Sequence, residues 1–348
     1  MPDALPDPLL RQLAGARVLV TGGGGLVGSR IVTQLAAHGA QPVVLDRFDA
    51  YPHPVRDQFQ VDEHAAQVVL GDVRERATVK WLTRQADFVI HAAAYADVAA
   101  CTRRPGTAFA ANVHGTQTVL DAVADSSVKR LVFVSSASVY GDGGGGGDEV
   151  ARFTEEQPLT PISVYANSKL WGENQVRLML GGTGTEHAIV RYFSVYGDPQ
   201  VPKPGSHSWM VPWLAMSAEC GLPLRLNGGG RQVRDMVHVE DIAHATILAL
   251  VTERAAGHIV NVGTGIATSV REIAELIAAH YPDASFAETP MPEGDPRGGY
   301  ADTARATDLL GWHPTVTLAD GIARYVTWLR TTPGAIPDWF TAPALLAA

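Results

Sequence analysis

The chain has 348 residues, of which 46% are hydrophobic and 18% charged, and its formal net charge at pH 7 is −9. This composition is typical of a globular protein with one large or two modest domains, and no apolar run approaches the ~18–20 residues that span a bilayer. The negative net charge argues against a general nucleic-acid binder, because phosphate backbones are bound by clustered positive charge.

The N-terminal segment 1–12 contains three prolines and two aspartates but no basic, apolar export pattern. Cys101 and Cys220 are the two cysteines, and their wide separation predicts neither a disulfide framework nor a metal cluster. We therefore expect a cytoplasmic protein without a bound metal.

The first strong pattern is the segment 17–30. Residues 17–21 form a short β-branched, apolar run, and apolar residues recur at helical spacing from 27 to 35. Between them, Gly22, Gly25 and Gly28 have the spacing G-x-x-G-x-x-G, which permits a tight turn and a close backbone approach to a pyrophosphate. The following helix N-terminus offers free N–H groups to phosphate. Dinucleotide binding is the favoured interpretation, and a floppy glycine loop is the alternative.

A second apolar run, 41–46, ends in Asp46, which lies 18 positions beyond Gly28. An acidic residue at about this distance typically binds a ribose hydroxyl of NAD. Asp46 would repel the additional phosphate of NADP, although the neighbouring Arg47 could reduce this repulsion. The alternative is a solvated loop aspartate.

Three further short strands are predicted at 67–70, 88–90 and 130–134, and a helix at 112–124. Strands alternating with helices predict an α/β fold with a doubly wound parallel sheet, which is the Rossmann type. Ligands bind at the carboxyl ends of such strands. The residues that follow these strands are Asp72 and Val73, then Ala92, Ala93 and Ala94, and then Ser135 and Ser136. The small alanines permit close approach of a flat ligand, or alternatively tight helix packing.

Tyr165 and Lys169 lie four residues apart in a predicted helix for which Ser163 is a plausible N-cap, so both can face one cleft. A tyrosine needs a pKa depressed by roughly 3 units, or about 4 kcal/mol, to act as a base near pH 7. A nearby ammonium and a positive nicotinamide ring could supply this. Most such pairs are surface snorkelling, but the position after Ser136 favours catalysis.

These residues are similar to the extended short-chain dehydrogenase/reductases, in particular their NAD-dependent sugar-nucleotide epimerase/dehydratase branch and its UDP-sugar 4-epimerases. The resemblance covers roughly residues 15 to 330. Its motifs, in chain order, are Thr21-Gly22-x-x-Gly25-x-x-Gly28, Asp72-Val73, His91-x-Ala93-Ala94, Asn112-Val113-x-Gly115-Thr116, Ser135-Ser136-Ala137-Ser138-Val139-Tyr140-Gly141, Tyr165-x-x-x-Lys169, Arg191-Tyr192-Phe193-Ser194-Val195-Tyr196-Gly197, Arg234-Asp235-Met236-Val237-His238-Val239-x-Asp241, Tyr300-Ala301-Asp302 and Leu310-Gly311-Trp312-x-Pro314.

The resemblance implies that NAD stays bound and is recycled, and that Ser136, Tyr165 and Lys169 are catalytic. Together with the residues singled out above, the candidate cofactor-binding residues are Gly22, Gly25, Leu26, Val27, Gly28, Asp46, Arg47, Asp72, Val73, Ala92, Ala93, Ala94, Asn112, Ser135, Tyr165, Lys169 and Phe193. The candidate substrate-binding residues are Ser136, Ser138, Tyr165, Ser194, Arg234 and Arg297. Arg234 resembles the arginine that grips the nucleotide diphosphate, and a salt bridge to Asp235 or Glu240 is its alternative role.

Departures from the family pattern reduce the number of candidate reactions. The dehydratases carry an Asp-Glu pair where this chain has Ala137 and Ser138, so loss of water is disfavoured. Decarboxylating relatives carry glutamate at the Ser138 position. Many 4-epimerases have asparagine at the position of Ser194, and the arginine that usually precedes the Gly-Asp pair aligns with Met291 or Pro292. Arg297 is a candidate replacement for that arginine.

We therefore expect an NAD-dependent 4-epimerase of a nucleoside-diphosphate sugar, which could be a UDP-hexose, a UDP-N-acetylhexosamine or a UDP-uronic acid. The polar run 203–207 is a candidate contact to a charged or substituted sugar. A reductase or dehydratase of the same family and a non-catalytic NAD-binding regulator are the alternatives. The family also implies a homodimer through the segments of Asn112 and Tyr165.

We expect an NAD-binding domain over 13–195, to which 236–265 returns. The predicted substrate lobe comprises 196–235 and 266–330, and 331–348 is a C-terminal tail. The glycine run 143–147 is predicted to be a surface loop, with a lid as the alternative.

Overall fold

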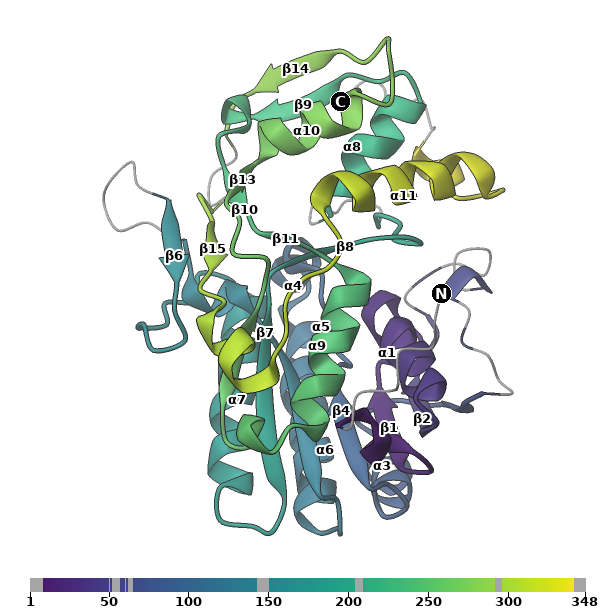
Figure 1. The fold of residues 1–348 in the computed structure, drawn as a ribbon, viewed down its shortest axis with the longest axis vertical. Helices are drawn as coiled ribbons and strands as arrows, with labels where there is room; N and C mark the ends of the chain where they lie inside the picture. Colours follow the sequence, from purple (N-terminus) through teal and green to yellow (C-terminus); the bar gives the residue numbers. More distant parts are fainter. Residues whose placement is uncertain are drawn as a thin grey trace.

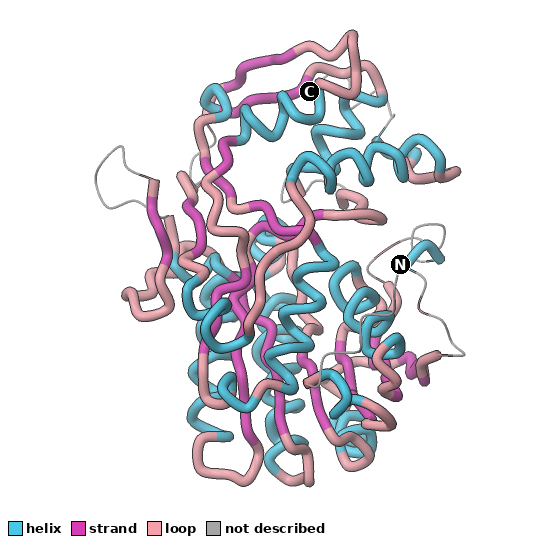
Figure 2. The backbone as a smooth tube through the Cα atoms, viewed as in Figure 1, coloured by secondary structure: helices cyan, strands magenta, loops and turns pink. Residues whose placement is uncertain are grey.

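The computed structural model describes residues 9–49, 51, 57–59, 61, 65–142, 150–203, 209–291 and 296–340. A seven-stranded sheet forms its centre, and all neighbouring strands in it run parallel (Figures 1 and 2). From one edge to the other, its strands are β12 (Ile259–Val262), β7 (Glu186–Tyr192), β5 (Arg130–Ser136), β4 (Phe88–His91), β1 (Arg17–Thr21), β2 (Gln41–Asp46) and β3 (Gln67–Leu70). The predicted doubly wound fold is confirmed.

Helices cover both faces of the sheet, which explains why its central strands are apolar on both sides (Figure 1). On one face, α1 (Leu26–Ala37) packs against α9 (Val239–Val251), and both contribute to one hydrophobic core. On the other face, α3 (Arg76–Thr83), α6 (Gly115–Ala124) and α7 (Val164–Leu180) enclose a second core. The helix expected at 112–124 begins with a π-helical turn at Phe109–His114, preceded by α4 (Val98–Arg103) and α5 (Pro105–Ala108).

A third hydrophobic core lies in the upper lobe of Figure 1. Its helices are α8 (Met210–Glu219), α10 (Val270–Ala278) and α11 (Leu318–Thr331). The strand pairs outside the main sheet are β6 (Ala151–Phe153) with β15 (Gly299–Ala301), β8 (Ser194–Tyr196) with β11 (Met236–His238), β9 (Leu224–Asn227) with β14 (Phe286–Thr289), and β10 (Val233–Arg234) with β13 (Thr268–Ser269). Three of these four pairs are parallel, and β10 with β13 is antiparallel.

Two buried aspartates, Asp235 and Asp241, connect segments of the second half of the chain through hydrogen bonds. Asp235 accepts hydrogen bonds from the backbone N–H groups of Thr264, Gly265 and Ala301. Asp241 accepts from the hydroxyl of Thr315 at 2.7 Å, which fixes the approach to α11. No helix among the described residues has the length and apolarity needed to cross a membrane. The glycine run 143–147 and residues 204–207 lie outside the described residues.

Candidate active site

The glycine turn joins β1 to α1 and is shaped to receive a phosphate. Gly22 has φ +75°, and a Cβ there would lie 2.7 Å from the Cα of Ala93. A Cβ on Gly28 would lie 2.1 Å from the carbonyl oxygen of Gly22, so both glycines are required for close packing. A Cβ on Gly25 would meet nothing nearer than 3.6 Å. Gly25 caps α1 without a side-chain hydrogen bond, so the first N–H groups of α1, from Leu26 onward, can bind an anion.

Asp46 lies beside this turn at the end of β2. Its carboxylate accepts hydrogen bonds from the N–H of Gly24 at 3.0 Å and from the N–H of Phe48 at 2.7 Å. Burial raises the pKa of Asp46, and these backbone hydrogen bonds oppose the rise. The carboxylate is therefore held in one orientation beside the turn, as a ribose-binding residue requires. The glycine turn, the uncapped helix and this carboxylate fit a dinucleotide.

A hollow of about 380 Å³ lies beyond Asp46, at the ends of β2 and β3. Its lining residues are Arg47, Asp49, Leu70, Gly71, Asp72, Arg74 and Glu75. Arg74 donates two hydrogen bonds to the carboxylate of Asp72, at 2.6 and 2.9 Å, and these lower the pKa of Asp72. Arg47 approaches the same carboxylate at 3.5 Å. The structure thus brings together two of the predicted cofactor-binding residues, Arg47 and Asp72, while the neighbouring Val73 is buried in a hydrophobic core.

Tyr165 and Lys169 lie on α7, and Ser163 caps this helix by accepting a hydrogen bond from Ala166, as predicted. The ammonium of Lys169 lies 5.8 Å from the ring centroid of Tyr165 and donates a 2.8 Å hydrogen bond to the carbonyl of Val134 on β5. Burial lowers the pKa of Lys169 to about 8. Burial raises the pKa of Tyr165, whereas its hydrogen bond with Ser136 lowers it.

The protein alone therefore keeps the Tyr165 phenol protonated, since burial outweighs the Ser136 hydrogen bond. Ser136 also accepts hydrogen bonds from the backbone N–H of Ser138 at 3.2 Å and from its hydroxyl at 2.9 Å. Three predicted site residues thus meet at the carboxyl end of β5. Their catalytic and binding roles stay predictions.

A buried ion pair fixes α7 against the sheet one turn beyond Lys169. The guanidinium of Arg191 on β7 binds both carboxylate oxygens of Glu173, at 2.9 and 2.7 Å, and the two side chains are 1% and 2% exposed. The hydroxyl of Ser135 donates to Glu173 at 2.5 Å. Ser135, a predicted cofactor residue, therefore has a structural bond to the helix that carries Tyr165.

Two further polar groups are buried behind the site. His91 bridges the hydroxyls of Thr21 and Thr116, at 2.7 and 2.9 Å, and burial lowers its pKa to about 3, so the ring is neutral. Asn112, in the π-helical turn, donates a 3.0 Å hydrogen bond to Ser168 of α7. These bonds link β1, β4, α6 and α7 around the site.

The predicted substrate residues from the second half of the chain lie on neighbouring segments. Arg234 on β10 donates to the carbonyls of Val233 at 2.8 Å and Pro296 at 3.2 Å. The backbone carbonyl of Arg297, which precedes β15, accepts a hydrogen bond from the N–H of Val233, so the backbones of Arg234 and Arg297 lie close together. Ser194 begins β8. Of the two positions that align with the missing family arginine, Met291 is described and its sulfur accepts a hydrogen bond from Gln232, whereas Pro292 lies outside the described residues.

Phe193, predicted at the nicotinamide pocket, is 8% exposed and belongs to a hydrophobic core, where its ring lies 6.2 Å from Phe153 and 6.4 Å from Tyr140. The alternative role of Arg234 was a salt bridge to Asp235 or Glu240, and both carboxylates have other partners. Asp235 accepts four hydrogen bonds from Thr264, Gly265 and Ala301, and Glu240 pairs with Arg30 at 3.2 Å. Ala92, Ala93 and Ala94 follow β4, and Leu26 and Val27 begin α1.

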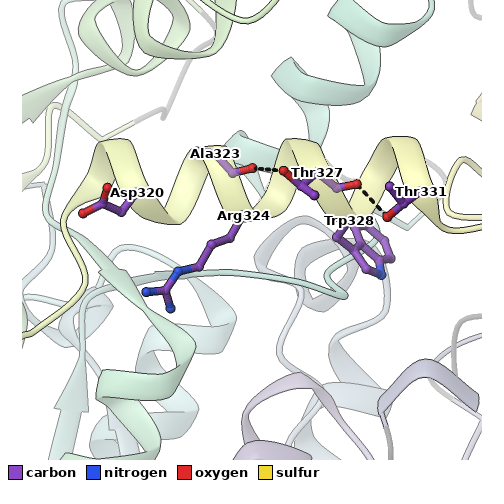
Figure 3. A pocket seen from close by; sticks show the side chains of 6 residues that line it. All are labelled: Asp320, Ala323, Arg324, Thr327, Trp328 and Thr331. Carbon is purple, nitrogen blue, oxygen red and sulfur yellow. Dashed lines mark hydrogen bonds between the residues drawn. The ribbon is translucent and has the colours of Figure 1, made fainter. Parts of the chain in front are cut away.

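A separate hollow of about 630 Å³ lies beneath α11 (Figure 3). All its lining residues come from this helix, and they are Asp320, Ala323, Arg324, Thr327, Trp328 and Thr331. The guanidinium of Arg324 extends away from the helix axis (Figure 3). The indole of Trp328 donates a 2.9 Å hydrogen bond to Gln58, which belongs to the connection between β2 and β3. None of the lining residues belongs to the predicted site.

Some residues that hold the site together were not singled out from the sequence. Glu173 is the clearest example, whereas its partner Arg191 and the buried Asp235 stand in the motifs given above but without their structural roles. The spacing of Glu173 from Lys169 was a usable signal, because residues four apart share a helix face. No group of three or more potential metal ligands occurs among the residues that the structure describes.

The fold and this arrangement define a dinucleotide-binding α/β protein with a Ser-Tyr-Lys set at the carboxyl edge of its sheet. The profile of the NAD dependent epimerase/dehydratase family matches residues 18–263, and the chain belongs to that family.

Two relatives and one solved structure illustrate the range. The chain is 32% identical, over 90% of its own length and 98% of the relative's, to a putative UDP-glucose 4-epimerase of Methanocaldococcus jannaschii. It is 31% identical to a dTDP-glucose 4,6-dehydratase of Actinoplanes sp., over 93% of this chain and 100% of that one. The UDP-glucose 4-epimerase of Thermus thermophilus in complex with NAD superimposes with a TM-score of 0.80 at 30% identity, covering 90% of this chain and 99% of that one. NAD is the cofactor of this family.

Proposed function

We propose that the protein inverts C4 of a nucleoside-diphosphate sugar through a transient 4-keto sugar. The observation that carries the proposal is the meeting of Ser136, Tyr165 and Lys169 at the end of β5, in a chain whose next two residues are Ala137 and Ser138. Elimination of water needs a second acid–base pair, and a methyl group and a hydroxyl cannot supply it. Oxidation followed by reduction at one carbon needs no such pair.

In this reaction, Tyr165 accepts the proton of the C4 hydroxyl while the C4–H bond breaks, and Ser136 hydrogen-bonds the same oxygen. NAD, held by the glycine turn, the N-terminus of α1 and Asp46, would supply the acceptor and donor of the C4 hydride. Between these events the keto sugar turns over, so that the hydride returns to the opposite face and Tyr165 gives the proton back to the oxygen. The protein alone keeps Tyr165 protonated, so the charged phenolate needs the positive nicotinamide ring of bound NAD in addition to the nearby ammonium of Lys169. Atoms and electrons balance without another reactant.

The nucleotide diphosphate is assigned to Arg234, with Arg297 beside it. A guanidinium can bind a phosphate through two parallel hydrogen bonds. The backbone hydrogen bond between Val233 and Arg297 supports this assignment, because it places the two arginines on neighbouring segments. The dTDP-glucose and UDP-glucose enzymes among the relatives are consistent with a hexose on either nucleotide.

The test is to incubate the purified protein with UDP-glucose, UDP-N-acetylglucosamine, UDP-glucuronic acid and dTDP-glucose and to follow C4 inversion by proton NMR. We expect one of these to equilibrate with its C4 epimer without added NAD. Formation of a 4-keto-6-deoxy sugar would instead assign dehydration. Turnover that requires added cofactor, with NAD lost on mild dialysis, would assign a net reductase.

We also propose a homodimer formed through the α6 and α7 face, in the cytoplasm. Exposed apolar side chains on this part of the chain support it, since Phe109 in the π-helical turn is 61% exposed and Leu178 on α7 is 79% exposed. Light scattering should give twice the 37.0 kDa mass of the chain. Replacing Leu178 by Asp should shift the protein towards the monomer.

A further inference from the structure

Lys203 belongs to the segment that connects β8 to α8, and its ammonium lies between two aromatic rings. It is 5.0 Å from the ring centroid of Tyr51, which follows β2, and 5.6 Å from that of Trp209, which caps α8. Cation–π contacts of this kind hold an ammonium in place without neutralising its charge. The side chain is partly buried, and within the described part of the chain it has no hydrogen bond and no carboxylate within 4.0 Å.

The carboxylates around Lys203 locate it on the sheet. Asp46 and Asp49, at the end of β2, and Asp97, which follows β4, all act on its charge. Strand β1 lies between β2 and β4. A cation that is influenced from both of these strand ends therefore lies over the end of β1, where the glycine turn and the N-terminus of α1 begin.

Each of these three carboxylates already has partners of its own. Asp46 accepts the N–H groups of Gly24 and Phe48, Asp97 caps α4 by accepting the N–H of Ala100 at 2.7 Å, and Asp49 pairs with Arg47. Lys203 is therefore not needed to satisfy any of them. Burial lowers the pKa of Lys203, and the three carboxylates oppose the fall. Among the described residues, none of these carboxylates pairs with Lys203 directly.

We propose that Lys203 binds the pyrophosphate of the dinucleotide from the side opposite the glycine turn. The turn and α1 offer N–H groups and a partial positive charge, but no residue from Val18 to Ser29 carries a cationic side chain. A pyrophosphate has two negative charges, and Lys203 supplies a full positive charge above the turn.

The assignment also gives the segment from β8 to α8 a function. It starts beside β11 at the top of the central sheet and leads to α8 in the upper lobe (Figure 1). Through Lys203, this connection binds the cofactor, and it ends at α8, which belongs to the predicted substrate lobe. Cofactor retention then depends on the placement of that lobe.

The test compares Lys203→Met with Lys80→Met. Methionine keeps the aliphatic contacts with both rings and removes only the charge, and Lys80 is an exposed lysine of α3 paired with Asp125 at 2.6 Å. For Lys203→Met we expect a fall of about 10- to 100-fold in affinity for NAD and for ADP-ribose, measured by calorimetry on cofactor-free protein. Affinity for adenosine, which has no phosphate, and the behaviour of Lys80→Met should match the wild type. Lys203→Arg should recover most of the affinity.

The diphosphate of the sugar nucleotide has the same chemistry as the pyrophosphate of NAD, so Lys203 could bind it instead. UDP binding to NAD-saturated protein distinguishes the two and should be unchanged in Lys203→Met. Wild-type affinity for NAD and ADP-ribose would overturn the proposal, and so would a loss confined to UDP. Both outcomes are read from binding alone, so they do not depend on whether the protein is an epimerase.

Discussion

Lys169 allows a quantitative test, because its charge is buried at the centre of the site. Lys169 is 3% exposed, and its ammonium donates a hydrogen bond to the carbonyl of Val134. Burial lowers its pKa from 10.5 to about 8, against the opposing charges of Cys101 and Glu173. Between these two pH values the unfolded chain holds a proton that the folded chain has released, so the free energy of unfolding must rise with pH.

The full rise is about 3 kcal/mol, since each unit of pKa shift corresponds to about 1.4 kcal/mol. Other groups also titrate in this range, so the measured quantity is the difference between wild type and Lys169→Met. Urea denaturation of cofactor-free protein at pH 7.5, 8.5, 9.5 and 10.5 should show the wild type gaining about 3 kcal/mol relative to the variant. Below about pH 7 the difference should be constant, because Lys169 is then protonated in both states.

The same reasoning predicts that Lys169→Met is at least as stable as the wild type at pH 7.5 although it loses turnover, as expected when a functional charge is buried at a cost in stability. Parallel pH curves for the two proteins would refute the buried-charge argument. With NAD bound, the slope should be smaller if the cofactor provides acceptors for the ammonium, as the family resemblance implies.

The remaining predictions concern three other residues. Tyr165→Phe should lower turnover by at least about 100-fold while the purified protein keeps its NAD, and normal turnover would remove the proposed base. Asp46→Ala should weaken NAD binding by about 10-fold or more, because it removes a charged acceptor of the ribose hydroxyls, and unchanged occupancy would contradict the ribose assignment. Glu173→Gln should lower the free energy of unfolding by about 3–5 kcal/mol, because it leaves the Arg191 charge buried and unpaired. It should also shift the alkaline limb of the pH–rate profile, because the Glu173 charge raises the pKa of Lys169. An unshifted profile would limit the ion pair to a structural role.

The sequence was sufficient to predict the fold because local signals and the global architecture agree. The segment 17–21 is short and apolar, Gly22 marks the turn, and the alternation of elements that follows allows only a parallel sheet with helices on both faces. The same holds for Tyr165 and Lys169, whose helical spacing and cap can be read without tertiary information.

Long-range contacts left no comparable local signal. The partners Glu173 and Arg191 are 18 residues apart on a helix and a strand, and each alone is an ordinary charged residue. Asp235 is equally uninformative, because its backbone partners come from two later segments, at 264–265 and 301. Such bonds depend on how elements pack, and hydrophobic periodicity does not encode that packing.

The role of Lys203 could not be predicted from local sequence, because this residue lies at the junction of two lobes. In the sequence it begins a polar run in a proline-rich connection and was grouped with possible sugar contacts. In the fold, Tyr51 and Trp209 hold it over the end of β1, because two connections that are 150 residues apart meet there. An ammonium that contacts two aromatic rings and has no carboxylate within 4.0 Å in the described part of the chain would be stabilised by a bound anion. The residue that best complements the glycine turn is therefore one that no glycine motif could reveal.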